Sequence, residues 1–220
     1  EKPIGHLIRA FSASGCVVFY IYGINNLMLS ENIAIVHSAP IIAAFLAVPI
    51  LGEKIGIFRI SAIVIGFIGV LIIVKPGTDL FKYEYIYPLI SALFMTSVYL
   101  TTRSIMSTDS SVAIIFYYSF ALLITSLIFF PDEFIMPKTN QLIFIISLGI
   151  MGSFGHLFMS QAAKYADVAV TSPFEYSSFL FVGLMGYLIF AEVPTFSIYL
   201  GGFIIIGSGI FIAYRERKNN

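Results

Sequence analysis

Apolar residues occur along this chain in long uninterrupted blocks that are separated by short polar breaks. Eight of these blocks approach the 20 or so residues that an α-helix needs to cross a bilayer. The breaks hold turn-forming or charged residues, as at Ser30-Glu31-Asn32 and Pro131-Asp132-Glu133. The pattern predicts an all-α polytopic membrane bundle with eight transmembrane helices, at residues 7–28, 33–51, 58–74, 86–105, 112–130, 142–163, 168–190 and 196–214.

Composition indicates that lipid is the outer solvent of these helices. Hydrophobic residues make up 59% of the chain and charged residues 11%, whereas a soluble domain carries roughly a quarter charged residues. The 12 basic and 12 acidic residues balance, so no nucleic-acid partner is predicted. Cys16 is the only cysteine, which excludes an intrachain disulfide. No cofactor or metal is predicted.

Basic residues divide unequally between the two sides of the predicted bundle. Eight spans place both termini on one side, which we assign to the cytoplasm. Only Lys75, Lys82 and Lys138 then lie outside, and this bias satisfies the positive-inside rule. The pattern predicts an inner-membrane protein with both termini cytoplasmic, in which the inner basic residues are Lys2, Arg9, Lys54, Arg59, Arg103, Lys164, Arg215, Arg217 and Lys218.

Two parts of the chain resemble each other. Residues 31–36 and 166–171 share a pattern, and each is followed by a span that ends in a glutamate, Glu53 or Glu192, and then by a glycine-containing span. The predicted topology starts the first copy outside and the second inside, so the two copies are inverted. Inverted repeats are a transporter architecture, with the substrate bound near the midplane between the halves.

The stretches Ser38–Gly77 and Ala162–Arg217, and above all the pattern Pro173-Phe174-Glu175-Tyr176 followed by Phe190-x-Glu-Val-Pro194, carry a family resemblance. The chain resembles EamA-type members of the drug/metabolite transporter superfamily, in the branch that includes S-adenosylmethionine and riboflavin transporters. The resemblance implies ten helices in two inverted repeats, of which the eight spans would be the third to the tenth. Residues 1–80 would then be the remainder of the first repeat, with three spans, and residues 81–220 the second repeat, with five.

A secondary transporter that moves a small metabolite by alternating access is the leading interpretation, since no nucleotide-binding motif is present. A non-transporting membrane scaffold or an inactive fragment is the alternative. An intramembrane enzyme is disfavoured: Ser153 and His156 share a helix face, but Met151 breaks the G-x-S-x-G motif. Small residues on two spans are predicted to be close-packing positions, namely Ala62, Gly66 and Gly69 on the span at 58–74 and Gly202, Gly207 and Gly209 on the span at 196–214. These faces leave a homodimer open, because they could pack within one chain or between two.

Glu175 is the main candidate for the transport pathway, since it is predicted to lie well inside a span, just after Pro173. It could bind a cationic substrate or carry a proton, or it could be a structural carboxylate. His156 is about as far as Glu175 from the predicted turn near Tyr165, so the two could share a depth and relay protons. Asn25 and His37 are matched in the same way across a predicted turn at Glu31.

Polar and small residues at helical spacing mark further candidate faces. They recur from Ser12 to Asn26 on the first span and from Gly149 to Ser160 on the sixth, and such faces either pack closely or line a cavity. Arg103 is predicted to be a topology anchor, and Glu53 and Glu192 to cap the helices that follow them. The predicted substrate and proton pathway comprises Glu175, His156, Tyr22, Asn26, Tyr99, Ser153 and Tyr176.

Overall fold

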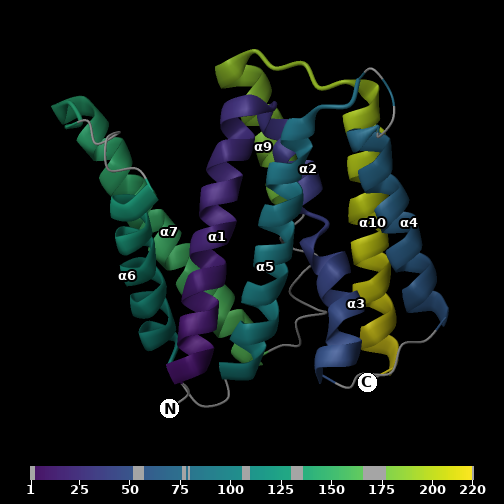
Figure 1. The fold of residues 1–220 in the computed structure, drawn as a ribbon, viewed down its shortest axis with the longest axis horizontal. Helices are drawn as coiled ribbons and strands as arrows, with labels where there is room; N and C mark the ends of the chain where they lie inside the picture. Colours follow the sequence, from purple (N-terminus) through teal and green to yellow (C-terminus); the bar gives the residue numbers. More distant parts are fainter. Residues whose placement is uncertain are drawn as a thin grey trace.

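The computed structural model describes residues 3–51, 57–75, 78, 80–105, 110–129, 136–165 and 177–219. These residues form α-helices and one 3₁₀ helix, and no strand occurs among them, which confirms the predicted all-α class (Figure 1). The helices are α1 Pro3–Asn26, α2 Leu29–Val36, α3 Ala39–Leu51, α4 Ile57–Val74, η1 Tyr83–Tyr85, α5 Ile86–Ile105, α6 Ser111–Phe129, α7 Thr139–Tyr165, α9 Ser177–Phe190 and α10 Phe196–Asn219.

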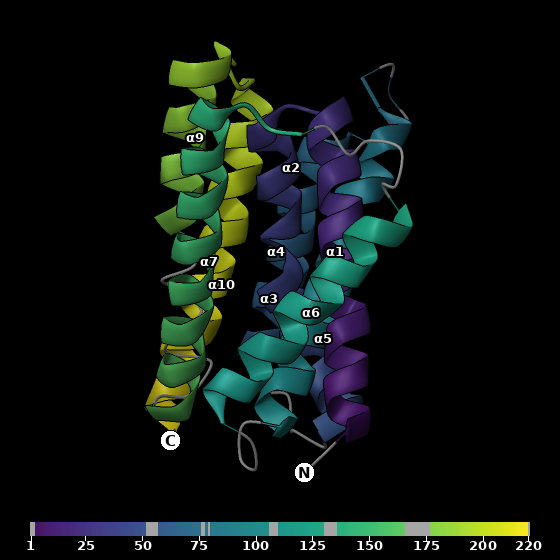
Figure 2. The ribbon, with the colours of Figure 1, turned by 90° about the vertical axis from the view of Figure 1, so that its left-hand side faces the viewer.

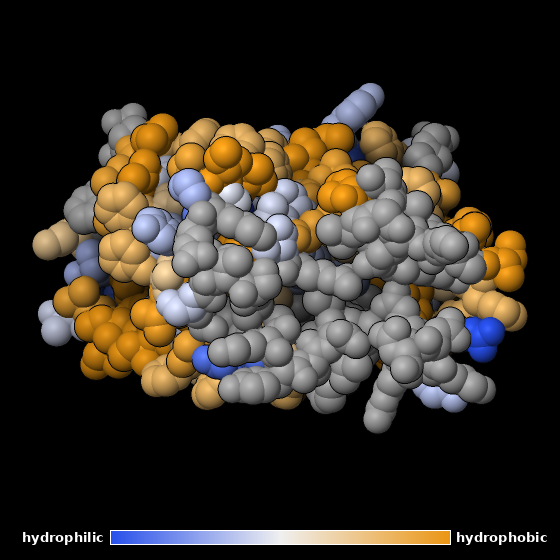
Figure 3. All heavy atoms as spheres, turned by 90° about the horizontal axis from the view of Figure 1, so that it is seen from below, coloured by the Kyte–Doolittle hydropathy of each residue, from blue (hydrophilic) through white to orange (hydrophobic). Residues whose placement is uncertain are grey.

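Four of these helices are long and apolar enough to cross a membrane by length and composition, namely α1, α5, α6 and α7. The apolar parts of the others are shorter, at Leu29–Ala43, Ile60–Val74, Phe181–Phe190 and Phe196–Ile212. The count of eight transmembrane helices therefore stays a prediction. Large apolar side chains cover much of the outside of the bundle, as Figure 3 shows around the rim of one end. Phe144 and Phe203, for example, are each 76% exposed, as expected for helices that face lipid.

The helices form two groups that meet at α2 and α3. α5 and α6 pack against α1, and α10 packs against α4. Figure 2 shows α7, α9 and α10 on one side of the molecule and α1 and α5 on the other. Both termini lie at the same end of the bundle (Figure 1).

The predicted turn at Ser30–Asn32 is wrong. These residues lie in α2, and the turn is at Leu27–Met28. Glu31 stabilises the earlier helix start, because its carboxylate accepts a hydrogen bond from the Met28 N–H at 3.2 Å. The match between Asn25 and His37 is therefore also wrong. Gly23 and Asn32 are the residues that face each other across this turn.

The predicted single span at residues 33–51 is interrupted between Val36 and Ala39. Pro40 explains the interruption, because it has no N–H and its ring clashes with the carbonyl four residues earlier, at Val36. α5 supports the break through Thr96, whose hydroxyl donates to the Ala39 carbonyl at 3.0 Å. The chain therefore crosses this region as a short helix, α2, and a separate helix, α3.

The backbones of α4 and α10 approach each other closely. A Cβ at Gly69 would lie 2.8 Å from the Gly201 carbonyl oxygen, and a Cβ at Gly201 would lie 2.6 Å from the Gly69 carbonyl oxygen. Gly66 and Ala62 also lie in this interface, which confirms their predicted close packing. Gly207 differs, since nothing lies within 4 Å of its Cβ position. These glycine faces pack against each other within one chain, and that packing does not support the homodimer.

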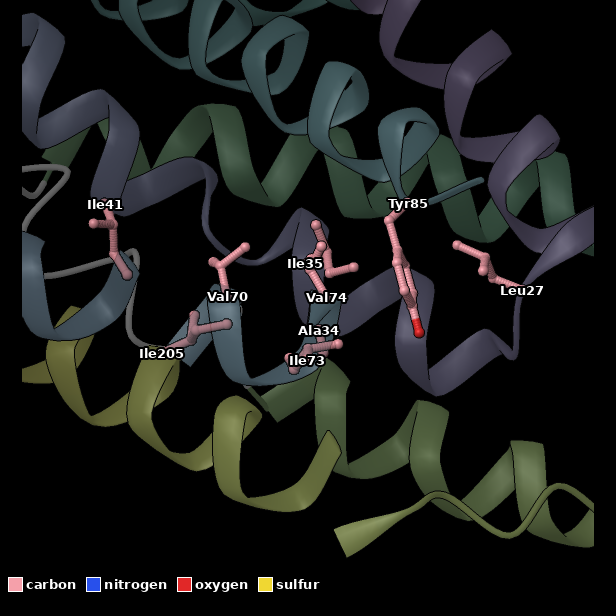
Figure 4. Packing of buried hydrophobic residues seen from close by; sticks show 9 residues of the cluster. All are labelled: Leu27, Ala34, Ile35, Ile41, Val70, Ile73, Val74, Tyr85 and Ile205. Carbon is pink, nitrogen blue, oxygen red and sulfur yellow. The ribbon is translucent and has the colours of Figure 1, made fainter. Parts of the chain in front are cut away.

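A buried cluster at the centre of the bundle fixes α2 and α3 against their neighbours (Figure 4). Ile35 is fully buried, and Ile41 is 2% exposed. Since lipid is as apolar as these side chains, close van der Waals packing is what stabilises such a cluster in a membrane. Its members are Leu27, Ala34, Ile35, Ile41, Val70, Ile73, Val74, Tyr85 and Ile205.

Candidate functional site

Two of the predicted pathway residues, Glu175 and Tyr176, lie outside the described residues, as does Pro173. The pairing of Glu175 with His156 therefore stays a prediction. His156 itself is half-buried on α7, with its ring centroid 4.3 Å from that of Tyr118 on α6. The imidazole thus lies where α7 meets α6.

Arg9 continues this contact into α1. Its guanidinium carbon lies 5.6 Å from the centroid of the Tyr118 ring, within cation–π distance. Its Nε–H donates to the Thr102 hydroxyl at 2.8 Å, and a terminal nitrogen donates to the Ile114 carbonyl at 3.3 Å. One cation therefore joins α1, α5 and α6 and, through Tyr118, contacts His156.

Sequence reasoning missed the importance of Arg9 because it placed this residue at the membrane boundary. α1 begins at Pro3, so Arg9 lies about 9 Å along the helix, and it is only 5% exposed. No carboxylate pairs with it within the part of the chain that the structure describes. Guanidinium has five N–H donors, and two of the Arg9 nitrogens donate to described residues of α5 and α6. The sequence feature that could have revealed this residue is an arginine within the first two turns of an apolar helix.

The predicted face of α1 packs against α5. The hydroxyls of Ser12 and Ser97 are 2.8 Å apart, and a Cβ at Gly15 would lie 2.7 Å from the Phe94 ring. Tyr22 lies further along the same face, with its ring 5.7 Å from that of Tyr87. The part of this face at Ser12 and Gly15 therefore packs closely against α5.

The other predicted residues that the structure describes lie on three different helices, α1, α5 and α7. Asn26 is exposed and donates to the Tyr22 carbonyl at 2.8 Å. Tyr99 is half-buried on α5. Ser153 is exposed and donates to the Gly149 carbonyl of its own helix at 2.8 Å. On the same helix, the Cβ positions of Gly149, Gly152 and Gly155 meet nothing within 4 Å.

α2 concentrates buried polar groups at the opposite end of the bundle from the termini. Glu31 is 5% exposed, and its carboxylate accepts from the Tyr85 hydroxyl at 2.9 Å and the Lys82 ammonium at 3.0 Å. At the C-terminus of α2, Nε2 of His37 lies 2.8 Å from the Ser178 hydroxyl of α9. Polar groups at such sites are costly in hydrocarbon and typically mark a pathway.

Three buried oxygen atoms on or next to α2 have no hydrogen-bond partner among the described residues. They belong to Ser30, Asn32 and Ser38, which are at most 3% exposed. An unsatisfied polar atom costs free energy unless water or a ligand supplies its partner. Ser30 also lines a cavity of about 350 Å³ between α2, α9 and α10, together with Gly183, Leu184, Tyr187, Pro194, Ile198 and Tyr199.

The prediction that Glu192 caps the helix that follows it is wrong. Its two carboxylate oxygens each lie 3.0 Å from the backbone nitrogen of Leu29, so it caps the N-terminus of α2. The sequence distance between these residues, 163 positions, explains why no local pattern could reveal the contact. It joins the two parts of the chain that resemble each other.

Comparison with protein families matches residues 3–75 and 82–214 to the model of the EamA-like transporter family. This chain belongs to the EamA-like transporter family. The family and its relatives are transporters, so the chain is not an enzyme, and it is a multi-pass membrane protein that transports a small molecule. The interpretation as an intramembrane hydrolase is thereby excluded.

Proteins similar to this chain are named for the transport of different molecules. An S-adenosylmethionine uptake transporter of Rickettsia prowazekii is 28% identical over 219 residues, which cover 100% of this chain and 74% of the relative. A riboflavin transporter of Vibrio cholerae is 27% identical over 217 residues, covering 98% of this chain and 73% of the relative. A pseudopaline exporter of Pseudomonas aeruginosa is 23% identical, covering 96% and 75%.

A solved crystal structure has the same fold. It matches with a TM-score of 0.66 and 17% sequence identity, over 97% of this chain and 79% of that chain. The arrangement of helices in this EamA-like transporter is therefore shared with a known protein, and the likeness is one of fold alone.

Proposed function

We propose that this protein is a secondary transporter that moves a small metabolite across the bacterial inner membrane by alternating access. Its two inverted repeats, residues 1–80 and 81–220, would rock against each other, and both termini would be cytoplasmic. The observation that carries the proposal is a pseudo-two-fold relation in the contact between α4 and α10.

The sequence repeat sets the offset for this relation. Glu53 and Glu192 end equivalent spans and are 139 positions apart, from 192 minus 53. The same offset relates Ala62 to Gly201 and Ile73 to Ile212. In the structure Ala62 packs with Ile212, and the Cβ position of Gly201 meets Ile73. Each contact therefore becomes the other when the offset is applied.

A second pair of contacts follows the same rule. The Cβ position of Gly66 lies 3.3 Å from the Ser208 Cβ, and that of Gly69 lies 2.9 Å from Ile205 Cγ1. The offset converts Gly66 to Ile205 and Gly69 to Ser208. Two-fold exchange of contacts is expected where inverted repeats meet, and the antiparallel packing of α4 on α10 is consistent with it.

The directions of the helices agree with this relation. Figure 1 shows α1 and α4 running away from the end where the termini lie, whereas α7 and α10 run toward it. α1 and α7 occupy equivalent places in the proposed repeats, and so do α4 and α10. Equivalent helices therefore run in opposite directions, as inversion across a membrane requires.

Within this scheme we propose that Glu175 and His156 carry the coupling proton or the cationic part of the substrate. Tyr22, Asn26, Tyr99, Ser153 and Tyr176 would line the route of the substrate. Buried polar atoms without partners on α2 and the interruption at Pro40 support a route beside this helix, because broken helices expose backbone groups to ligands near the midplane.

Flux measurements on proteoliposomes test the transport function. The relatives are named for S-adenosylmethionine, riboflavin and pseudopaline, so labelled S-adenosylmethionine and riboflavin are suitable probes. We expect saturable counterflow of at least one probe and a loss of about tenfold or more in Glu175→Gln. Glu84→Gln, which changes a carboxylate outside the proposed route, should retain the parent flux.

Each outcome has a defined meaning. Absence of counterflow with folded protein would favour the scaffold interpretation over transport. Unchanged flux in Glu175→Gln would remove Glu175 from the pathway while the transport function stands.

A further inference from the structure

The two proposed repeats also contact each other at the N-terminus of α2. We infer that Glu192 closes the outer end of the transport pathway by capping α2, an inference that rests on the proposed alternating access. Both carboxylate oxygens of Glu192 lie 3.0 Å from the Leu29 nitrogen. This contact joins the end of α9, in the second repeat, to the start of α2, in the first.

The N-terminus of α2 needs such a partner. The first N–H groups of a helix have no acceptor within the helix, and together they carry a partial positive charge. Met28 makes no side-chain cap hydrogen bond, and Glu31 satisfies the Met28 N–H instead. The acceptor for the Leu29 N–H is therefore the Glu192 carboxylate, which comes from the other half of the molecule.

Glu192 likewise depends on α2. Among the described residues no basic side chain forms an ion pair with it, so the helix terminus is what compensates its charge. When the halves separate, water replaces both partners. The cap therefore favours the state in which the halves are together at this end.

The end of α9 is shaped to hold the carboxylate over α2. Ala191 adopts a left-handed backbone with φ of 53°, and the Glu192 N–H donates to the Gly186 carbonyl at 3.1 Å. A Cβ at Gly186 would lie 3.2 Å from Glu192 Oε2, closer than most contacts of this kind. Gly186 is therefore the residue that leaves room for the cap, whereas a Cβ at Gly183 on the same helix meets nothing within 4 Å.

α2 also contacts α9 at its C-terminal end. It is separated from α3 by the break at His37–Ser38, and His37 contacts Ser178 of α9 at 2.8 Å. The cavity beside Ser30 lies between α2, α9 and α10, and two of its lining residues, Ser30 and Pro194, are close in sequence to the capped Leu29 and to Glu192. Opening at Glu192 would therefore expose Ser30, which is 2% exposed when the cap is formed.

Thiol labelling tests this inference. Cys16→Ser removes the only cysteine, and Ser30→Cys places a thiol next to the capped Leu29. A membrane-impermeant maleimide added from outside should label this background slowly. We expect labelling at least fivefold faster in Glu192→Ala and in Gly186→Ala. The matched controls Glu84→Ala and Gly207→Ala should label at the parent rate, since a Cβ at Gly207 meets nothing within 4 Å and Gly207 does not line the cavity.

The outcomes separate this inference from the proposed function. Parent labelling rates in both Glu192→Ala and Gly186→Ala would overturn the role of Glu192, even if the parent transports its probe. Faster labelling in both, with normal controls but no flux in the parent, would overturn the transport proposal alone. Thermal unfolding in detergent identifies a variant that labels quickly because it is unfolded. If Glu192→Ala is unfolded, the comparison of Gly186→Ala with its glycine control decides the result.

Discussion

At the residue scale, Arg9 is the least expected feature of the molecule. A buried cation in an apolar bundle is costly unless hydrogen bonds and charge compensate it. Here a hydroxyl, a backbone carbonyl and the face of Tyr118 surround it. Since these partners come from two other helices, Arg9 determines how α5 and α6 lie against α1.

Arg9→Gln tests this role. The variant removes the charge and leaves the Ile114 carbonyl and the Thr102 hydroxyl without their donor. Hydrogen bonds to charged groups contribute about 1.5–3 kcal/mol each, so we expect the midpoint of thermal unfolding in detergent to fall by several degrees. Arg215→Gln at the end of α10, where the guanidinium lies 4.2 Å from the Phe58 ring centroid, should change it much less. Equal shifts would show that Arg9 is not a structural centre.

At the element scale, the break between α2 and α3 distinguishes this protein from a bundle in which every helix is continuous. α2 alone has eight residues, too few to be stable in isolation. It is held by contacts with α5, α9 and α10 and by carboxylates at its N-terminus. A short helix that depends on its neighbours can change partners when they move, which a continuous span cannot do.

Pro40→Ala tests the importance of the break. Alanine restores an N–H and removes the ring clash with Val36, so α2 and α3 should tend to join. We expect slower amide hydrogen exchange around Ser38 and flux reduced about fivefold or more, with thermal stability retained. Pro137→Ala, outside the helices, is the control. Parent flux together with slower exchange would show that transport does not need the break.

The contact between α4 and α10 makes a second prediction at this scale. Gly69 and Gly201 each face the carbonyl of the other at less than 3 Å from the Cβ position, so alanine at either site forces the backbones apart. Overpacking typically costs about 1–3 kcal/mol. We expect Gly69→Ala and Gly201→Ala to lower the unfolding midpoint by similar amounts, and Gly207→Ala to leave it unchanged. Very different effects of the first two would contradict the mutual approach of the two backbones at Gly69 and Gly201.

At the scale of the whole molecule, equivalent helices of the two proposed repeats are covered to different extents by other helices. α5 and α6 cover α1, whereas α7, the equivalent of α1, packs mainly against α6 among the described residues. The apolar window of α7, Thr139–Met159, has no buried residue. The pseudo-two-fold relation therefore leads us to expect helices, and not lipid alone, against the glycines of α7 in the working transporter.

Gly152→Leu tests this expectation. A glycine face allows helices to approach closely, so leucine at this position should reduce flux about tenfold or more. Met151→Leu is the control. Met151 lies on the same helix and is 72% exposed, and leucine resembles methionine in size and polarity. Parent activity in Gly152→Leu would place this face against lipid.

The sequence by itself determined the membrane class, the family and most helix positions, because these follow from the length of apolar runs and from local breaks. The prediction for α5, residues 86–105, matches the structure at both ends. Local composition could not show that Glu192 caps α2 or that Arg9 is buried between three helices. Leu29 is 163 positions from Glu192, and the hydrogen-bond partners of Arg9 are 93 and 105 positions away, so only packing in three dimensions brings them together. The turn at Leu27–Met28 was missed for a related reason, since Glu31 has the polarity of a loop residue, and only its contacts with Lys82 and Tyr85 place it inside the bundle.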